Sequence, residues 1–149
     1  MLQFKNLPEG KKCIDRPGSY GIITQATELV LVRIRGWGEY FLPGGGIDEG
    51  EHPEQALKRE VIEETGYKVT DLEKIGEAAE YIFSPVAGTY INKLGMFYSA
   101  RITDQDHTLI VEEDHEIVFL SDKEAIEVLH LDSHKWAVQQ WIKKTKNTR

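Results

Sequence analysis

The spacing of apolar residues along the chain predicts a series of short β-strands. Residues 20–35 hold two strand-like runs, and the second, ELVLVRIR, alternates from Leu31 onward as a half-buried strand does. A turn is predicted at 36–39 and a short strand at 40–43, which a proline ends. GGGIDEGE then predicts a glycine-rich loop, and further strand-like segments occupy residues 67–83, 90–102 and 116–120.

Three segments have the features of helices. The first is expected to begin near Pro53, because proline suits the first helical position, and to end at Gly66, because glycine tolerates the left-handed conformation that ends helices. Ser121 and Glu124 have the spacing of a capping box at the start of a short second helix. A last helix is predicted at about 133–144.

The order of these elements is strands, one helix, more strands and two helices. That order predicts an α+β fold in which a mixed β-sheet lies between helices, not a doubly wound sheet. A length of 149 residues suggests one domain, 1–149, long enough to bury a hydrophobic core. The final residues, KKTKNTR, are expected to form a frayed, solvated tail.

The sequence REVIEETG at 59–66 crowds three glutamates onto the first predicted helix. Glu60 neighbours both Glu63 and Glu64 at helical spacing, and each like-charge i,i+4 pair costs roughly 0.2–0.5 kcal/mol. The glutamates also lie near the helix C-terminus, where the helix dipole disfavours acids. Either solvent or a bound cation must therefore offset the repulsion.

Two features near these glutamates bear on whether they form a cation site. Arg59 lies four residues before Glu63 and can pair with it, which would fix a carboxylate rotamer. The glycines at 44–46 can bring backbone carbonyls close to an ion because no side chains obstruct them. Carboxylates and a carbonyl make an all-oxygen site of the kind that Mg²⁺ or Mn²⁺ prefers. Acidic runs on helices are nevertheless usually solvated faces, so the three glutamates alone do not decide the matter.

The surrounding pattern resembles the Nudix box, the signature of the MutT-like Nudix hydrolases. The box is G-x5-E-x7-R-E-U-x-E-E-x-G-U, where U is a bulky apolar residue. Val61 fills the first U, and Tyr67 fills the second with an aromatic residue. Every fixed position of the box matches, at Gly45, Glu51, Arg59, Glu60, Glu63, Glu64 and Gly66.

The resemblance implies a Nudix fold and an Mg²⁺- or Mn²⁺-dependent hydrolase. Its substrate would be a nucleoside diphosphate linked to another moiety, cleaved at the pyrophosphate bond. Glu60 and Glu64 would be the main metal ligands, and Glu63 a further ligand or the general base. Arg59 would orient a glutamate, and the carbonyl of Gly44 could complete the metal's ligand set.

A carboxylate outside the box is also expected at the site. The resemblance implies a glutamate just before the late strand at 116–120, and loops on a rigid scaffold often carry a mobile catalytic group. Glu112 is the first candidate for the general base, with Glu113 close behind and Glu116 at the strand's start. The alternative is an acidic loop that is simply solvated.

Composition narrows the class of protein. The net charge of −7 argues against a surface that coats nucleic acid, but not against a small nucleotide substrate when a metal supplies positive charge. No stretch approaches a membrane span, and the first residues have no apolar signal region, so a cytoplasmic protein is expected. Cys13 is the single cysteine and excludes an internal disulfide. Homodimerisation is left open.

Other residues carry weaker signals. Five aromatic side chains could stack on a nucleobase, although any one aromatic is more often part of a core: Trp37, Tyr40, Phe83, Tyr90 and Tyr98. The histidines are scattered, and none is assigned as a ligand. The alternative to the enzyme is a Nudix-fold nucleotide-binding or regulatory domain without turnover. Such domains usually lose box glutamates, whereas this chain keeps them all.

Overall fold

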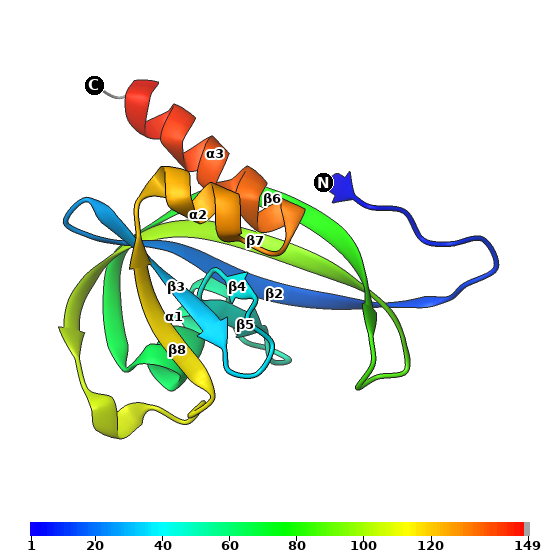
Figure 1. The fold of residues 1–149 in the computed structure, drawn as a ribbon, viewed down its shortest axis with the longest axis horizontal. Coiled ribbons are helices and arrows are strands. Elements are labelled where there is room, and N and C mark those ends of the chain that lie inside the picture. The colour runs from blue at the N-terminus through cyan, green and yellow to red at the C-terminus, as the bar shows by residue number, and fades with distance from the viewer. Residues whose placement is uncertain (148–149) are drawn as a thin grey trace.

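The computed structural model describes the backbone of residues 1–147 and the side chains of residues 1–146. Strands dominate its first two thirds, and two of the helices close the chain (Figure 1). The elements are β1 (Leu2–Phe4), β2 (Cys13–Gln25), β3 (Glu28–Ile34), β4 (Tyr40–Phe41), β5 (Gly44–Gly46), α1 (Pro53–Thr65), β6 (Tyr67–Ser84), β7 (Thr89–Gln105), a 3-10 turn (His107–Leu109), β8 (His115–Leu120), α2 (Asp122–Val128) and α3 (Asp132–Asn147).

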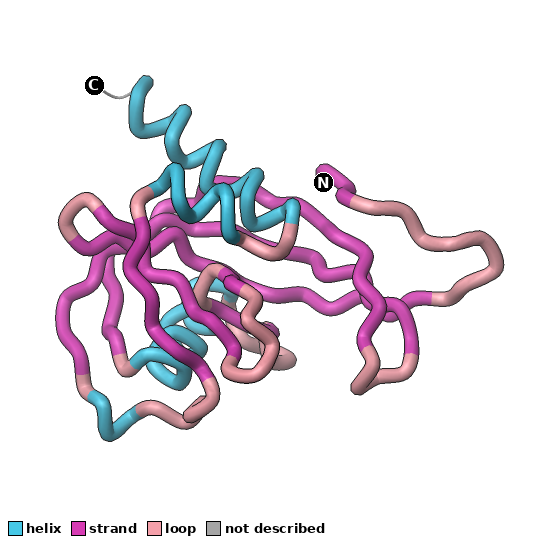
Figure 2. The backbone as a smooth tube through the Cα atoms, in the orientation of Figure 1, coloured by secondary structure: helices cyan, strands magenta, loops and turns pink. Residues whose placement is uncertain are grey.

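The strands form one mixed sheet, as predicted. Its main path runs β1-β6-β7-β2-β3-β4, with β5 paired to β2 and β8 paired to β3. The β2–β7 and β1–β6 pairs are parallel, and the other pairs are antiparallel. The long β6–β7 hairpin extends to one end of the molecule (Figure 2).

Helices cover both faces of the sheet, which confirms the predicted α+β layering. Leu57 and Val61 of α1 pack with Val30 in one buried cluster, while Ala137 and Val138 of α3 belong to a second cluster. Figure 1 shows α1 on one side of the strands and α2 with α3 on the other. Among the described residues, no helix is long and apolar enough to span a membrane.

The structure corrects several local expectations. Strand β3 is buried on both faces, with Val30 in one cluster and Leu31 in the other, so it is not half-buried. Gly44–Gly46 forms strand β5 against β2, not a loop. The short strand β1, which pairs with β6, was not predicted. Helix α3 continues through residues 143–147 of the expected frayed tail, and residues 148–149 of that tail lie outside the described residues.

The ends of α1 are fixed by local caps. Proline stands at the start of the helix as predicted, and the His52 side chain accepts a hydrogen bond from the Glu54 N–H. At the other end Gly66 has φ 75°, a left-handed conformation, and a Cβ there would lie 2.7 Å from the Asp106 carbonyl oxygen. These caps set the last turns of α1, and therefore the glutamates, in a defined position against the sheet.

Candidate active site

The site begins where β5 crosses the glutamates of α1. A Cβ at Gly45 would lie 2.5 Å from the carboxyl carbon of Glu60, so any other residue would displace this carboxylate from its present position. The Gly44 N–H donates a hydrogen bond of 2.8 Å to Glu64 Oε1. The close contact between a short glycine strand and a helix thus brings Glu60 and Glu64 together with the backbone of β5.

Arg59 is the centre of the acidic cluster. Its Nε and Nη2 donate to the two carboxylate oxygens of Glu51, at 2.8 and 2.9 Å. Its Nη1 donates to Glu60 at 2.9 Å and to Glu63 at 3.4 Å, and its Nη2 also donates to the Gly46 carbonyl at 3.0 Å. The predicted Arg59–Glu63 pairing is present, but the bidentate partner of Arg59 is Glu51.

The carboxylates differ in their pKa values because their surroundings differ. Hydrogen bonds from Arg59 lower the pKa of Glu51 to about 2. Burial raises the pKa of Glu60, against the opposing effect of Arg59. Glu64 is only 5% exposed, and burial raises its pKa to about 6. The site therefore combines one firmly ionised carboxylate with two whose negative charge is costly.

His115 is a site residue that the sequence did not reveal. Its Nε2 lies 3.2 Å from Glu64 Oε2, and its Nδ1 lies 2.9 Å from Asp114 Oδ1. The hydrogen bond to Glu64 raises the pKa of His115 to about 9. His115 begins β8, far along the chain from α1, and the pairing of β8 with β3, with the contacts of the preceding loop to α1, brings the two side chains together. No local spacing signals such a contact.

The acidic loop before β8 is docked on the end of α1. The N–H groups of Val111 and Glu112 donate to the Glu63 carbonyl oxygen at 2.8 and 3.0 Å. A Glu112 carboxylate oxygen lies within 4.8 Å of a ring nitrogen of His115, and His115 contacts Glu64, so Glu112 lies beside the cluster. The structure thus brings together all of the predicted site residues: Gly44, Arg59, Glu60, Glu63, Glu64 and Glu112.

The other candidates in this loop lie differently. Glu113 is exposed, and Glu116 pairs with Arg35 at 3.3 Å. Glu112, Asp114 and His115 form the group among the described residues whose potential ligand atoms all lie within 4.8 Å of one another. The glutamates of α1 are not in such a group, and their carboxylates contact Arg59, the Gly44 N–H and His115.

The residues of the cluster fit a hard divalent cation. They offer carboxylate oxygens, the donors that Mg²⁺ and Mn²⁺ prefer, beside a backbone free of side chains at Gly45. Ser19, which pairs with Gly45 across β2 and β5, has a buried hydroxyl with no hydrogen-bond partner among the described residues. An unpartnered buried polar atom beside clustered carboxylates is consistent with a site that binds a further group.

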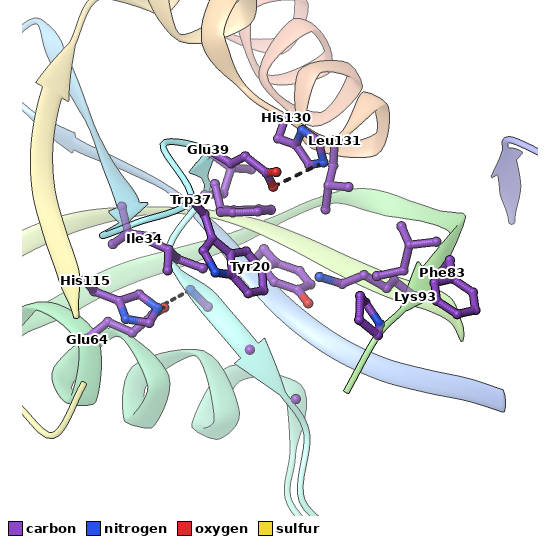
Figure 3. Close-up of a pocket in the computed structure, with 18 residues that line it drawn as sticks. Tyr20, Ile34, Trp37, Glu39, Glu64, Phe83, Lys93, His115, His130 and Leu131 are labelled. Carbon is purple, nitrogen blue, oxygen red and sulfur yellow. Dashed lines mark hydrogen bonds and ion pairs between the residues drawn. The ribbon is translucent and has the colours of Figure 1, made fainter. Parts of the chain in front are cut away.

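A cleft of about 690 Å³ opens beside the cluster, with Glu64 and His115 at one end (Figure 3). Trp37 and Phe83, 63% and 53% exposed, line it and are free to contact a ligand. Tyr98 is buried in the core and cannot stack on a base. The cleft is lined by Tyr20, Val32, Ile34, Trp37, Glu39, Phe41, Leu42, Gly44, Gly45, Gly46, Glu64, Ile82, Phe83, Pro85, Lys93, His115, His130 and Leu131.

Comparisons with known proteins agree on one domain family. A family model described as the NUDIX domain matches residues 15–145. The RNA pyrophosphohydrolase of Rhodopseudomonas palustris (strain BisB18) is 34% identical over 79 residues, which cover 47% of this chain and 44% of that protein. Nudix hydrolase 25 of Arabidopsis thaliana is 34% identical over 96 residues, covering 61% and 51%. The matches thus span about half or less of these curated relatives.

Solved structures share the fold. A NUDIX hydrolase from Nitrosomonas europaea matches with a TM-score of 0.71 over 87% of this chain and 90% of its own, at 19% sequence identity. At that identity the likeness shows the fold alone. It confirms the architecture predicted from the order of the elements, a mixed sheet between helices.

The Glu51–Arg59 pair makes stability depend on pH. Glu51 has a folded-state pKa of about 2 against an ordinary value of 4.5, so its stabilising effect is present above pH 4.5 and is lost as pH falls toward 2. We expect Glu51→Gln to be less stable than the wild type at neutral pH, with a difference that shrinks across this window. Urea unfolding at a series of pH values measures it, with exposed Glu49→Gln as the control. A difference that is the same at pH 2 and pH 7 would contradict this assignment.

Proposed function

Because the chain belongs to the NUDIX domain family, we propose that it is a hydrolase of phosphoanhydride bonds. Its substrate is a nucleoside diphosphate linked to a second moiety, cleaved at the pyrophosphate. The observation that carries the proposal is the position of the intact box: its Glu64 and Gly45 line one end of a cleft large enough for a nucleotide. The single domain is taken to comprise residues 1–149.

The cofactor of the proposed reaction is Mg²⁺ or Mn²⁺. Glu60, Glu63 and Glu64 would hold it, with the Gly44 carbonyl as a further donor. When bound, such an ion neutralises phosphoanhydride oxygens and makes water more acidic. That chemistry explains why the chain tolerates like charges at the negative end of a helix.

The chain's own residues have separate roles in this proposal. Arg59 orients Glu60 and Glu63 by direct hydrogen bonds, and Glu51 holds the Arg59 guanidinium in a bidentate pair. Glu112 is the general base that takes a proton from the attacking water. The position of Glu112 supports this role, because backbone hydrogen bonds hold the loop that carries Glu112 against the Glu63 carbonyl of α1.

The cleft supports a nucleotide as the substrate class. Trp37 presents an exposed aromatic face on which a base can stack, and the Glu39–His130 pair at 3.3 Å offers polar atoms nearby. One relative is named an RNA pyrophosphohydrolase, which is consistent with phosphoanhydride chemistry at a nucleotide. A binding domain without turnover is the weaker alternative, because every box glutamate is present.

Glu64→Gln should lower kcat by about 100-fold or more, since even the loss of an outer partner of a metal ligand typically costs 10–100-fold. The amide can still accept the hydrogen bond from Gly44, so the fold should persist. Hydrolysis of a panel of nucleoside diphosphate derivatives with Mg²⁺, followed by product chromatography, measures the effect. Glu127→Gln, an exposed glutamate on α2, is the control. Full turnover by Glu64→Gln would refute the assigned role.

Glu112→Gln should lower kcat by roughly 100-fold or more, the lower range for a positioned base. Glu113→Gln, one residue away and exposed, is the matched control and should keep a near-normal rate. The measurement is kcat at saturating metal and substrate. If the variants at 112, 113 and 116 all retain near-normal rates, the base lies within the box and Glu63 takes that role.

A further inference from the structure

The cleft continues beyond the glycine strand into a second hollow of about 400 Å³. The two spaces share part of their lining, so they are one continuous surface. Figure 3 shows Lys93 on the far side of Tyr20 from Glu64 and His115. The shared residues are Tyr20, Gly46, Ile82 and Lys93.

Two cations lie side by side in this hollow. Arg16 of β2 and Lys93 of β7 are direct partners in the parallel pairing of these strands, so their side chains leave the same face of the sheet. Tyr20 follows four residues after Arg16 on that face, and the Lys93 Nζ lies 5.3 Å from the centre of its ring. Lys93 is half-buried and Arg16 is exposed, so the pair reaches from the cleft wall to solvent.

Neither cation is neutralised by a carboxylate. Among the described residues, no acidic group lies within 4 Å of the Arg16 guanidinium or the Lys93 ammonium. Asp48, which lines the hollow, lies 3.5 Å from Arg59. Glu80 is the neighbour of Lys93 across the β6–β7 pair, but its oxygens accept from the N–H groups at the start of α3.

This positive charge stands out because the chain as a whole carries a net charge of −7. Two unneutralised cations in one concave surface attract an anion, and the half-buried position of Lys93 strengthens the attraction relative to open solvent. A phosphate monoester carries about −1.5 to −2 charges near neutral pH, which matches two cations. Arginine also presents a planar fork suited to phosphate oxygens.

We propose that Arg16 and Lys93 form a subsite for a second phosphate group of the substrate, separate from the pyrophosphate that is cleaved. This inference rests on the proposed function, since it uses the same cleft. Substrates that carry a phosphate monoester in addition to their pyrophosphate are therefore preferred over the same molecules without it. The subsite selects the substrate and takes no part in bond cleavage.

Equilibrium binding to the metal-free protein tests the subsite without turnover. Isothermal titration in chelator compares adenosine with adenosine 2′,5′-bisphosphate and adenosine 3′,5′-bisphosphate. The wild type should bind at least one bisphosphate about tenfold more tightly than adenosine, as expected for added charge-assisted hydrogen bonds. In the Arg16→Gln/Lys93→Met double variant this ratio should fall to about one. Methionine keeps the apolar stem of Lys93 that packs near Tyr20.

The matched control is Lys11→Gln/Lys12→Gln, which removes the same number of positive charges from exposed positions outside the hollow. It should retain the wild-type ratio, because it changes net charge without changing the subsite. Equal wild-type affinity for adenosine and both bisphosphates would overturn the proposal. So would a preference that survives in the Arg16/Lys93 variant or disappears in the control.

Rates of hydrolysis distinguish a failure of the phosphate subsite from a failure of the proposed hydrolase activity. With Mg²⁺, kcat/KM is compared within two pairs of substrates: NADPH with NADH, and coenzyme A with dephospho-coenzyme A. The first member of each pair carries the additional phosphate monoester. The Arg16→Gln/Lys93→Met variant should lose any preference for that member. Hydrolysis without such a preference in the wild type would overturn the subsite and support the hydrolase. No hydrolysis of any substrate, together with the expected bisphosphate binding, would overturn the hydrolase and support the anion subsite.

Discussion

Repulsion among the carboxylates at the end of α1 is the constraint on which the site depends. The guanidinium of Arg59 contacts the carboxylates of Glu51, Glu60 and Glu63, so one positive charge faces three negative charges. Burial adds to the cost, since it raises the pKa of Glu60 and of Glu64. A bound divalent cation would offset this excess negative charge, and carboxylate oxygens are ligands that such a cation prefers.

The scaffold holds that charge in place by close backbone contacts. Gly45 lets β5 lie against Glu60, and the Gly44 N–H binds Glu64. The loop before β8 reaches the same helix end through hydrogen bonds to the Glu63 carbonyl. Segments distant in sequence therefore converge on the last turns of α1. The cleft runs from this acidic end past Tyr20 to Arg16 and Lys93, so its two ends differ in charge.

The features that were predictable from sequence are those set by local spacing. The bounds of α1 and the capping box at Ser121 depend on neighbouring residues, and both were predicted correctly. The contact of His115 with Glu64 depends on strand pairing, and no spacing encodes it. The same is true of β1, whose partner lies far along the chain. Strand β3 was taken as half-buried because its pattern alternates, but helices cover both of its faces.

A titration with Mn²⁺ shows whether the acidic cluster holds a cation, independently of any assay of turnover. Electron paramagnetic resonance of free Mn²⁺, titrated with the metal-free protein, gives the affinity. We expect saturable binding by the wild type and a loss of affinity of about tenfold or more in Glu60→Gln and in Glu64→Gln. Absence of saturable binding by the wild type, or unchanged affinity in both variants, would contradict this expectation.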